Sequence, residues 1–403
     1  MPPLPRWLSL GSRFARARKR VELRLSRPKC HDLVIFDDVF PQPLSAFRIC
    51  EFTAYLRQFQ DTTVYSTGGS FPLLGETRCL AEVIAGFESL HPELRGRVYP
   101  FEATRRLKAR VAYTVFVANT ARFAEAAEHS GAAVAFTLYP GGGFYLDRKA
   151  SDEMLRRIMG ARSFRKVIVT QKVTRDYLLD RSLCAPEQIE FIYGGVFPHY
   201  SSAASAKVRF AESKDSFDVC FVAHKYMPGG YDKGYDVFVE VVRRLANAYP
   251  RMRFHVVGPF TPDDGNVSDQ RRQVTFYGTR DGSFFGEFYR RMDMILSPNA
   301  PFLLAPGAFD GFPTGACVEA GLCGVAVVAT DCLKQNIAFQ DGRDIIIVPR
   351  NVDAIIDRIE FFYRNPTQLQ TLADSGRKSF EKVFAYSAQI EPRIQLLEAL
   401  LRV

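Results

Sequence analysis

The chain has 403 residues, enough for two domains of ordinary size, and its 47% hydrophobic and 24% charged residues are typical of a soluble globular protein. The formal net charge is +9, but the first 29 residues hold nine basic residues and a single acid, so the rest of the chain carries only +1. This nearly neutral body excludes the evenly basic surface of a nucleic-acid-binding domain, and we expect no nucleic-acid partner for it.

Cysteine usage and apolar runs indicate where the protein works. The eight cysteines show no Cys-x-x-Cys spacing and several lie in apolar runs, which indicates reduced core thiols in a cytoplasmic protein and no metal site. The sequence holds no apolar run near the roughly 18 residues that a membrane-spanning helix needs. We therefore expect a cytoplasmic protein that does not cross a membrane.

Residues 1–30 form a basic amphipathic tail. Trp7, Leu10, Phe14 and Ala17 recur at intervals of three or four residues, which places them on one face of a predicted helix flanked by cations. Such a helix suits an anionic membrane surface, where each cation contributes about 1 kcal/mol, so peripheral attachment to the inner face of a membrane is one hypothesis. A disordered or packed tail and an Arg-rich transit peptide are the alternatives.

From residue 31 onward, short apolar runs alternate with segments of helical pattern. Two such series are separated by a polar break at 201–207, and this alternation predicts parallel sheets covered by helices. The predicted strands are 33–36, 111–117, 132–136, 167–169 and 189–193 in the first series, and 217–222, 254–257, 274–276, 294–296, 325–329 and 345–348 in the second. The predicted helices include 46–59, 152–159, 235–248, 284–292, 315–322 and 352–364.

The predicted fold class is therefore α/β, with two Rossmann-like, doubly wound domains. We place the first domain at residues 31–200 and the second at 208–385. The loops at the carboxyl ends of both sheets are expected to face a central cleft, which is where ligands bind in open α/β sheets.

The segment 309–331 carries the strongest chemical signal. Asp310 precedes a Gly/Pro turn, the turn opens a short helix that contains Glu319, and a buried strand follows. A helix N-terminus offers unpaired N–H groups and partial positive charge, so it is a natural seat for phosphate. The two acids could accept hydrogen bonds from hydroxyls on either side of that phosphate. A nucleotide sugar has this order of groups: sugar hydroxyls, diphosphate and ribose hydroxyls.

The loop 223–235 follows the first strand of the second domain and brings two cations to its carboxyl end. These are Lys225 and Lys233, with His224 as the alternative to Lys225. Two cations opposite a helix N-terminus would clamp a diphosphate and stabilise the charge that develops on a leaving phosphate. The competing interpretation is a solvated loop without a ligand.

Turns at the ends of other strands supply the remaining cleft candidates. Glycine in such a turn lets the backbone approach a ring or a ribose closely. In the second domain the candidates are Gly258, Gly278 and Thr279. In the first domain they are Ser45, Ala46, Tyr139, Gly141, Gly142 and Gly143.

Several common motifs are missing from the sequence. No Asp-x-Asp occurs, so a metal-bridged diphosphate is not supported. The sequence also lacks a Gly-x-Gly-x-x-Gly dinucleotide fingerprint, a Gly-x-x-x-x-Gly-Lys-Ser/Thr loop and the Gly-x-Ser-x-Gly motif of esterases. We expect neither a metal nor a cofactor.

With these residues and motifs, the second domain resembles the donor-binding half of retaining glycosyltransferases with the GT-B fold. It is most similar to the large family 4 (glycosyl transferases group 1). The resemblance covers roughly residues 217–350, and the first domain matches in pattern only. Seven pieces occur in the order of that family, namely 233–236, 256–258, 276–278, 296–298, 310–313, 319–320 and 324–330.

The resemblance implies a role for each candidate. Lys225 and Lys233 would be the cation pair on the donor diphosphate, Asp310 would face the hydroxyls of the donor sugar, and Glu319 would bind the ribose. Backbone N–H groups of Thr314 and Gly315 would hold phosphate. The other implied donor-binding residues are Gly234, Gly258, Gly278, Thr279, Gly311, Phe312 and Pro313. Relatives also lead us to expect that the last helix, within 386–403, crosses back onto the first domain.

The chain departs from the family in three places. Eight residues, rather than seven, separate Asp310 from Glu319, and the first acid is Asp rather than Glu. The first cation is Lys225 or His224 in a longer loop, where the family often has Arg. No His stands in 137–144, where many members carry one.

These observations predict a retaining, metal-independent, hexosyltransferase-type glycosyltransferase. It would move a sugar from a nucleotide-sugar donor to a hydroxyl of a carbohydrate or lipid-linked acceptor, in surface polysaccharide or glycolipid assembly. The alternatives are a phosphorylase or an epimerase on the same two-domain fold, and a basic nucleic-acid-binding protein that is supported by the tail alone.

Overall fold

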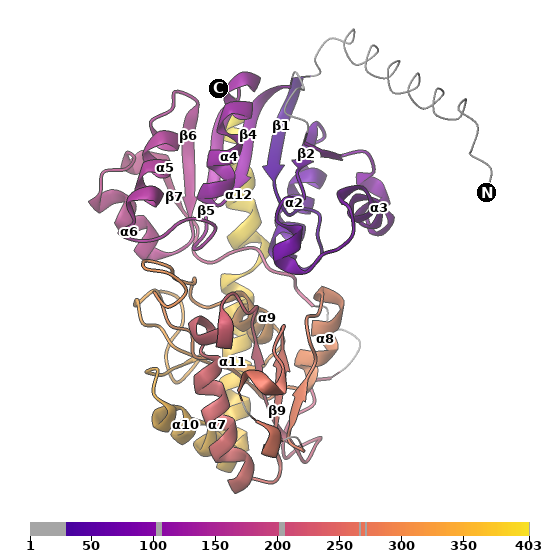
Figure 1. Cartoon of the computed structure of the whole chain (residues 1–403), viewed down its shortest axis with the longest axis vertical. Coiled ribbons are helices and arrows are strands. Elements are labelled where there is room, and N and C mark those ends of the chain that lie inside the picture. The colour runs from indigo at the N-terminus through magenta and orange to yellow at the C-terminus, as the bar shows by residue number, and fades with distance from the viewer. Residues whose placement is uncertain (1–29, 102–106, 201–205, 266, 271, 403) are drawn as a thin grey trace, which may run out of the picture.

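The computed structural model describes residues 30–101, 107–200, 206–265, 267–270 and 272–402 (Figure 1). Residues 1–29 of the predicted tail lie outside these residues, and Cys30, the last residue assigned to it, begins β1. Figure 1 shows two α/β domains, one above the other, with the N-terminal domain at the top. Among the described helices, none is long and apolar enough to cross a bilayer.

The N-terminal domain is built on a seven-stranded, wholly parallel sheet. Its strand order is β3-β2-β1-β4-β5-β6-β7. The central strands are buried on both faces, which is why their sequences are almost continuously apolar. The strands are β1 Cys30–Asp37, β2 Thr62–Ser66, β3 Val98–Pro100, β4 Lys108–Val115, β5 Ala133–Leu138, β6 Phe164–Val169 and β7 Ile189–Phe191.

Helices of the N-terminal domain cover both faces of this sheet, and one of them comes from the far end of the chain. Helix α12 packs on α2 and β4, and its Ile390, Ile394 and Leu397 lie in the core of this domain. In Figure 1 the yellow C-terminal segment runs upward from the lower domain into the upper one. The helices are α2 Ala46–Gln58, α3 Leu80–Leu90, α4 Val117–Ser130, α5 Lys149–Met159, α6 Lys172–Asp180 and α12 Tyr386–Leu401.

The C-terminal domain has a six-stranded parallel sheet in the order β10-β9-β8-β11-β12-β13. The chain winds outward from β8 in one direction and from β11 in the other, so the crevice between these two strands is the expected ligand position. The strands are β8 Phe217–Val222, β9 Met252–Val257, β10 Val274–Phe276, β11 Met294–Ser297, β12 Ala326–Ala329 and β13 Ile346–Ile347. The helices are α7 Tyr235–Ala248, α8 Gly282–Arg291, α9 Gly315–Leu322, α10 Val352–Arg364 and α11 Pro366–Val383, and a 3-10 segment, η4 Pro228–Lys233, precedes α7.

The predicted α/β class with two doubly wound sheets is confirmed, and each predicted strand is present. The predicted strand 111–117 ends earlier than expected, because Phe116 has a positive φ of 68° and α4 begins at Val117. The apolar pattern did not single out β2, β3, α3, α4, α6 or α11. β2 and β3 are only five and three residues long, and several of the helices are rich in Ala and polar residues.

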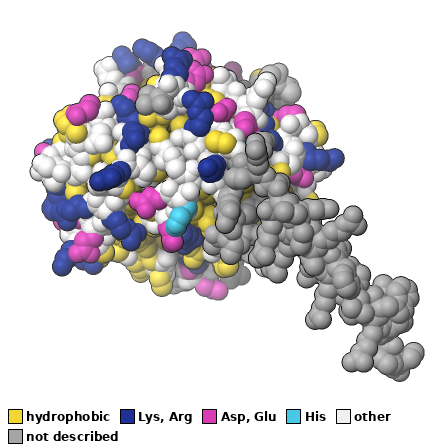
Figure 2. Space-filling model, turned by 90° about the horizontal axis from the view of Figure 1, so that it is seen from above, with side chains coloured by type: hydrophobic (Ala, Val, Ile, Leu, Met, Phe, Trp, Pro, Cys, Tyr) yellow, Lys and Arg dark blue, Asp and Glu magenta, His cyan; other side chains and the backbone are white. Residues whose placement is uncertain are grey.

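The surface agrees with the charge count. On the face in Figure 2, which views the molecule from the end of the N-terminal domain, Lys and Arg side chains are scattered among Asp and Glu side chains. The described body therefore presents mixed charge on this face, as its formal charge near zero predicts.

Candidate active site

The centre of the candidate site is an ion pair that joins the loops after β8 and β11. The Lys233 ammonium donates to both carboxylate oxygens of Asp310, at 2.7 Å each. Burial lowers the pKa of Lys233, but the Asp310 carboxylate more than offsets this, so the pKa lies above its usual value. The two loops flank the crevice between β8 and β11, and a permanent cation is held there.

A second carboxylate lies beside Lys233 and was not predicted. Asp232 is buried at 3% exposure, its Oδ2 is 3.6 Å from the Lys233 ammonium, and neither oxygen has a hydrogen-bond partner among the described residues. Burial raises the pKa of Asp232, and the charge of Lys233 only partly opposes this. A buried carboxyl without a hydrogen bond is costly, and the nearby charge of Lys233 offsets this cost only in part.

The two predicted cations, Lys225 and Lys233, form ion pairs with different acids. Lys225 donates to both oxygens of Asp264, at 2.9 and 3.0 Å, so the structure does not bring it into the Lys233–Asp310 pair. His224 interacts electrostatically with Lys233. Burial, and then the positive charge of Lys233, lower the pKa of the His224 imidazole. His224, the alternative first cation, is therefore an uncharged imidazole near neutral pH and not a second cation beside Lys233.

Tyr226, a further residue that the sequence did not single out, fills the space between these groups. Its ring lies 4.6 Å from the His224 ring and 5.2 Å from the Lys233 ammonium, measured between centroids and from centroid to Nζ. The side chain is half exposed. An aromatic ring under a cation stabilises the charge at this edge of the crevice.

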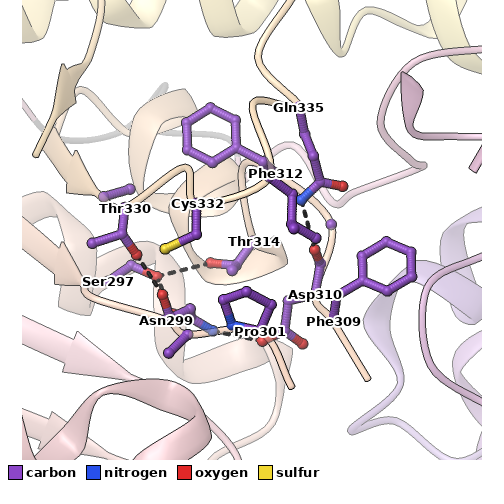
Figure 3. Close-up of a pocket in the computed structure, with 14 residues that line it drawn as sticks. Ser297, Asn299, Pro301, Phe309, Asp310, Phe312, Thr314, Thr330, Cys332 and Gln335 are labelled. Atoms are coloured by element: carbon purple, nitrogen blue, oxygen red, sulfur yellow. Dashed lines mark hydrogen bonds between the residues drawn. The ribbon is translucent and has the colours of Figure 1, made fainter. Parts of the chain in front are cut away.

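Asp310 is positioned by two amide side chains from its own domain. Asn299 Nδ2 donates to Asp310 Oδ2 at 2.7 Å, and Gln335 Nε2 donates to the backbone oxygen of Asp310 at 3.0 Å. Figure 3 shows the two amides approaching Asp310 from two sides. Asn299 follows β11 and Gln335 follows β12, so the carboxyl ends of adjacent strands fix the predicted sugar-facing acid.

The turn after Asp310 leads into the N-terminus of α9 as predicted, with Thr314 at the N-cap position. Phe312 is buried in the core, Pro313 follows it in a cis peptide, and Thr314 Oγ1 lies 3.3 Å from Ser297 Oγ. Gly315 is the first helical residue, and a Cβ there would lie 2.9 Å from the Phe197 ring. The first N–H groups of a helix have no partners within the helix, which leaves this end able to bind an anion.

Glu319 lies one turn further along α9 and meets the segment that joins the domains. The Tyr200 hydroxyl donates to Glu319 Oε2 at 3.1 Å. Burial raises the pKa of Glu319 to about 7, although the Tyr200 hydrogen bond acts to lower it. The Glu319 carboxylate also acts on Cys50 of α2. Burial, and then the charge of Glu319, raise the pKa of the Cys50 thiol to about 12. Glu319 therefore lies at the junction of both domains.

The predicted glycines of the C-terminal domain fall into two groups. Gly234 and Gly258 have positive φ, and a Cβ would lie 2.2 Å from the Pro298 oxygen in the first case and 1.9 Å from the Ala223 oxygen in the second. These two glycines are needed for packing between strand ends. Gly278 also has positive φ, but no described atom lies within 4 Å of its added Cβ, and Thr279 beside it is exposed. This turn is open to a ligand.

The candidates of the N-terminal domain serve the fold around the cleft. Ser45 Oγ accepts a hydrogen bond from Arg48 at 3.1 Å, and Ala46 begins α2. The Tyr139 hydroxyl donates to buried Glu51 at 2.9 Å. All three glycines of 141–143 have positive φ; Gly142 and Gly143 pack against Phe116 and Ala118, whereas an added Cβ on Gly141 meets no described atom within 4 Å.

A shallow hollow adjoins the ion pair at the ends of β11 and β12 (Figure 3). Its walls include Asp310, Gly311 and Thr314 of the predicted site, whereas Lys233 and Glu319 are not among its wall residues. Polar groups contributed by Ser297, Asn299, Thr330 and Gln335 line the rest, together with apolar Phe309 and Phe312. Asp310 is thus the residue shared by the crevice and this hollow. Within the described ranges, no group of three or more His, Cys, Asp or Glu could hold a metal ion.

Comparison with known proteins shows which family model and which solved structures the chain resembles. Residues 217–365 match the family described as Glycosyl transferases group 1, and no curated protein matches the sequence. Among solved structures, HepE from Anabaena in complex with UDP and glucose is similar at a TM-score of 0.64 and 15% identity, covering 92% of this chain and 100% of that one. A glycosyltransferase from Rickettsia africae covers 92% and 99% with a TM-score of 0.62 and 14% identity.

The similarity extends over both domains. Sucrose-phosphate synthase from Thermosynechococcus elongatus is similar at a TM-score of 0.60 and 15% identity, covering 92% of this chain and 100% of that one. At such low identities the likeness concerns the fold. The chain therefore has the two-domain GT-B fold of these enzymes, and its residues 217–365 match the family described as Glycosyl transferases group 1.

Proposed function

We propose that the protein transfers a sugar from a nucleotide sugar to an acceptor hydroxyl, with retention of configuration and without a metal ion. The observation that carries the proposal is the Lys233–Asp310 pair, which places a cation and a hydrogen-bond acceptor at the crevice ahead of the α9 N-terminus. Glu319, one turn into the same helix, supplies a second carboxylate. A nucleoside diphosphate sugar presents matching groups in matching order.

In this proposal each part of the donor has a protein partner. The ribose hydroxyls donate to Glu319, the base lies against the open turn at Gly278, and the diphosphate lies between Lys233 and the N–H groups of Thr314 and Gly315. The donor sugar then reaches Asp310. HepE supports a nucleoside diphosphate as the ligand class, since structures of that protein hold UDP and UDP-glucose.

The chemistry follows from charge development on the leaving diphosphate. As the anomeric bond breaks, negative charge grows on the phosphate oxygen, and Lys233 with the α9 amides stabilises it. The departing oxygen takes the proton of the acceptor hydroxyl on the same face of the sugar, which retains the configuration. Lys225 would join the phosphate only after leaving Asp264, and His224, whose lowered pKa leaves it uncharged, would contribute a hydrogen bond from its ring N–H and not a second charge.

The acceptor is proposed to be a carbohydrate or lipid-linked hydroxyl in surface polysaccharide or glycolipid assembly, reached from the cytoplasm. The support is the predicted basic helix in residues 1–29, which would hold the enzyme at an anionic membrane. A chain beginning at residue 30 should lose binding to vesicles of anionic phospholipid. Equal binding by the two chains would remove the support for a membrane acceptor.

A thermal-shift panel of UDP, GDP, ADP and their sugars tests the donor site. A nucleotide that binds only the folded state raises stability by about 2.7 kcal/mol at a hundredfold excess over its Kd. Incubation of the best donor with acceptors should then release the nucleoside diphosphate and form a product of unchanged anomeric configuration by NMR, with EDTA present. Release of a sugar phosphate would instead indicate a phosphorylase, and isomerisation of the nucleotide sugar would indicate an epimerase.

A further inference from the structure

We propose that Gln171 of the N-terminal domain is a positioning residue for the donor site. Its side chain holds the turn that follows Asp310, so that this turn takes its working shape only when the two domains are docked. The inference rests on the proposed function for its kinetic consequence, but its structural part can be measured separately.

Gln171 reaches the turn directly. It follows β6, occupies the N-cap position of α6 without a side-chain capping bond, and is 3% exposed. Its Oε1 accepts a hydrogen bond from the backbone N–H of Phe312 at 3.3 Å. A side chain of one domain therefore satisfies a buried backbone donor of the other, two residues after Asp310. A buried N–H that loses its acceptor is costly, so this bond determines how the peptide is oriented.

The turn is shaped to lie against Gln171. A Cβ on Gly311 would lie 2.8 Å from Gln171 Nε2, and Gly311 has no positive φ in this structure. The glycine is therefore needed for close approach between the domains rather than for backbone freedom. Any side chain at this position would separate the turn from Gln171.

The loop that carries Asp310 is docked on the N-terminal domain at two further points. The Leu146 N–H donates to the Gly307 oxygen at 2.9 Å, and the Phe144 and Phe309 rings meet edge to face with centroids 5.8 Å apart. The contacts at Gly307, Phe309 and Phe312 fall on both sides of Asp310. Movement of the domains apart would release all three together.

The binding and chemical roles of the site then separate between the domains. Glu319, Lys233 and the Gly278 turn belong to the C-terminal domain, so nucleotide binding does not require Gln171. Asn299 and Gln335 of that domain also hold Asp310 itself. Gln171 orients the peptide between Asp310 and the phosphate-binding end of α9. Small errors in the position of groups at this site slow the chemical step strongly.

Hydrogen exchange tests the structural part without any assumption about activity. In Gln171→Met, which has similar length but no acceptor, the peptide covering residues 309–316 should exchange about tenfold faster, the loss expected for one hydrogen bond. Gln171→Glu keeps an acceptor and should retain the protection. Gln171→Asn, which is shorter, is a second way to remove the contact. Unchanged protection in both the Met and Asn variants would overturn the inference.

Kinetics test the functional part, with Lys172→Met as the matched control. Lys172 is the next residue, exposed and paired with Asp176 on α6, away from the turn. We expect Gln171→Met to lower kcat about tenfold or more while the donor KM and the Kd for UDP change less than twofold, and Lys172→Met to leave kcat unchanged. A loss confined to KM, or an equal loss in the control, would contradict a positioning role. Absence of any transfer by the wild type would instead refute the proposed function.

Discussion

The Tyr200 hydroxyl lies 3.1 Å from Glu319 Oε2, so a residue of the segment that joins the domains holds the carboxylate assigned to the ribose. Tyr200 packs beside Phe285 and over Gly286 of α8, where a Cβ on the glycine would lie 3.6 Å from the Tyr200 Cβ. No described cation pairs with Glu319, and burial raises its pKa to about 7. Its charge therefore changes near neutral pH.

We expect the affinity for UDP to rise several-fold between pH 6 and pH 8. The ionised carboxylate is a stronger acceptor for ribose hydroxyls than the protonated acid, and Glu319 ionises across this range. Isothermal titration calorimetry at several pH values measures the slope. Glu319→Gln should bind more weakly at pH 8 and show a flatter profile; the same slope in this variant would assign the titration to another group.

The raised pKa of Glu319 also makes the stability of the fold depend on pH, and the stability falls as the pH rises, whereas the affinity for UDP increases. The pKa of Glu319 is raised from 4.5 to about 7, so the folded state holds the proton more tightly than the unfolded state. The stabilisation is complete below about pH 4.5 and is lost as the pH rises through 7. Between pH 5 and pH 8, the free energy of unfolding of the wild type should therefore fall more than that of Glu319→Gln, as urea titrations would measure.

The three basic groups after β8 should differ in their importance. Lys233→Met should lower kcat by about 10²- to 10³-fold, because it removes the cation from the developing phosphate charge and leaves Asp310 and Asp232 without it. Lys225→Met breaks the pair with Asp264 and the contact with the Phe260 ring, neither of which involves Lys233 or Asp310, and should cost much less. His224→Leu should have an intermediate effect. An equal loss for Lys225→Met and Lys233→Met would show that Lys225 leaves Asp264 to reach the donor.

The sequence allowed the sheets to be predicted because buried parallel strands are continuous apolar runs, as in Phe217–Val222. It also placed Lys233, Asp310 and the α9 N-terminus in one crevice, since strand ends of a parallel sheet share one edge. Three features could not be predicted from it: the pairing of Lys225 with Asp264, the burial of Asp232 without a hydrogen bond, and the contact of Gln171 with Phe312. These depend on side-chain direction and on how the two domains meet, and no periodicity in the sequence encodes either.

Two of the predicted donor-site glycines should respond differently to an added methyl group. Gly258→Ala places a Cβ 1.9 Å from the Ala223 oxygen, which backbone movement alone can relieve, and it should lower the free energy of unfolding by more than about 2 kcal/mol. Gly278→Ala has open space and should cost only the about 1–2 kcal/mol of a left-handed alanine. Urea unfolding measures the two losses of stability.

The Gly278 variant also tests the position of the base. Because the Gly278 turn faces the proposed base, the variant should lose affinity for UDP while it stays folded. Unchanged affinity would show that the base binds elsewhere.

The return of α12 to the N-terminal domain depends on a buried charge. Arg393 is fully buried, and so is Glu51 of α2, which accepts hydrogen bonds from the hydroxyls of Tyr55, Tyr113 and Tyr139. Burial opposes the charge of Arg393, but Tyr139 and then Glu51 more than offset this and raise its pKa. Arg393 Nη1 donates to Gln389, whereas its Nε and Nη2 have no hydrogen-bond partner among the described residues. Glu51 therefore acts on Arg393 through its charge and not through a direct ion pair.

Arg393→Met should consequently destabilise the protein by about 3–5 kcal/mol, because it leaves the Glu51 carboxylate buried without a compensating cation. Glu51→Gln/Arg393→Met, which removes both charges, should recover most of this loss. The free energies of unfolding in urea of the wild type, both single variants and the double variant close the cycle. If the double variant instead lost as much free energy of unfolding as the two single variants together, Arg393 would stabilise α12 through packing alone. In that case its interaction with Glu51 would not hold the C-terminal helix on the first domain.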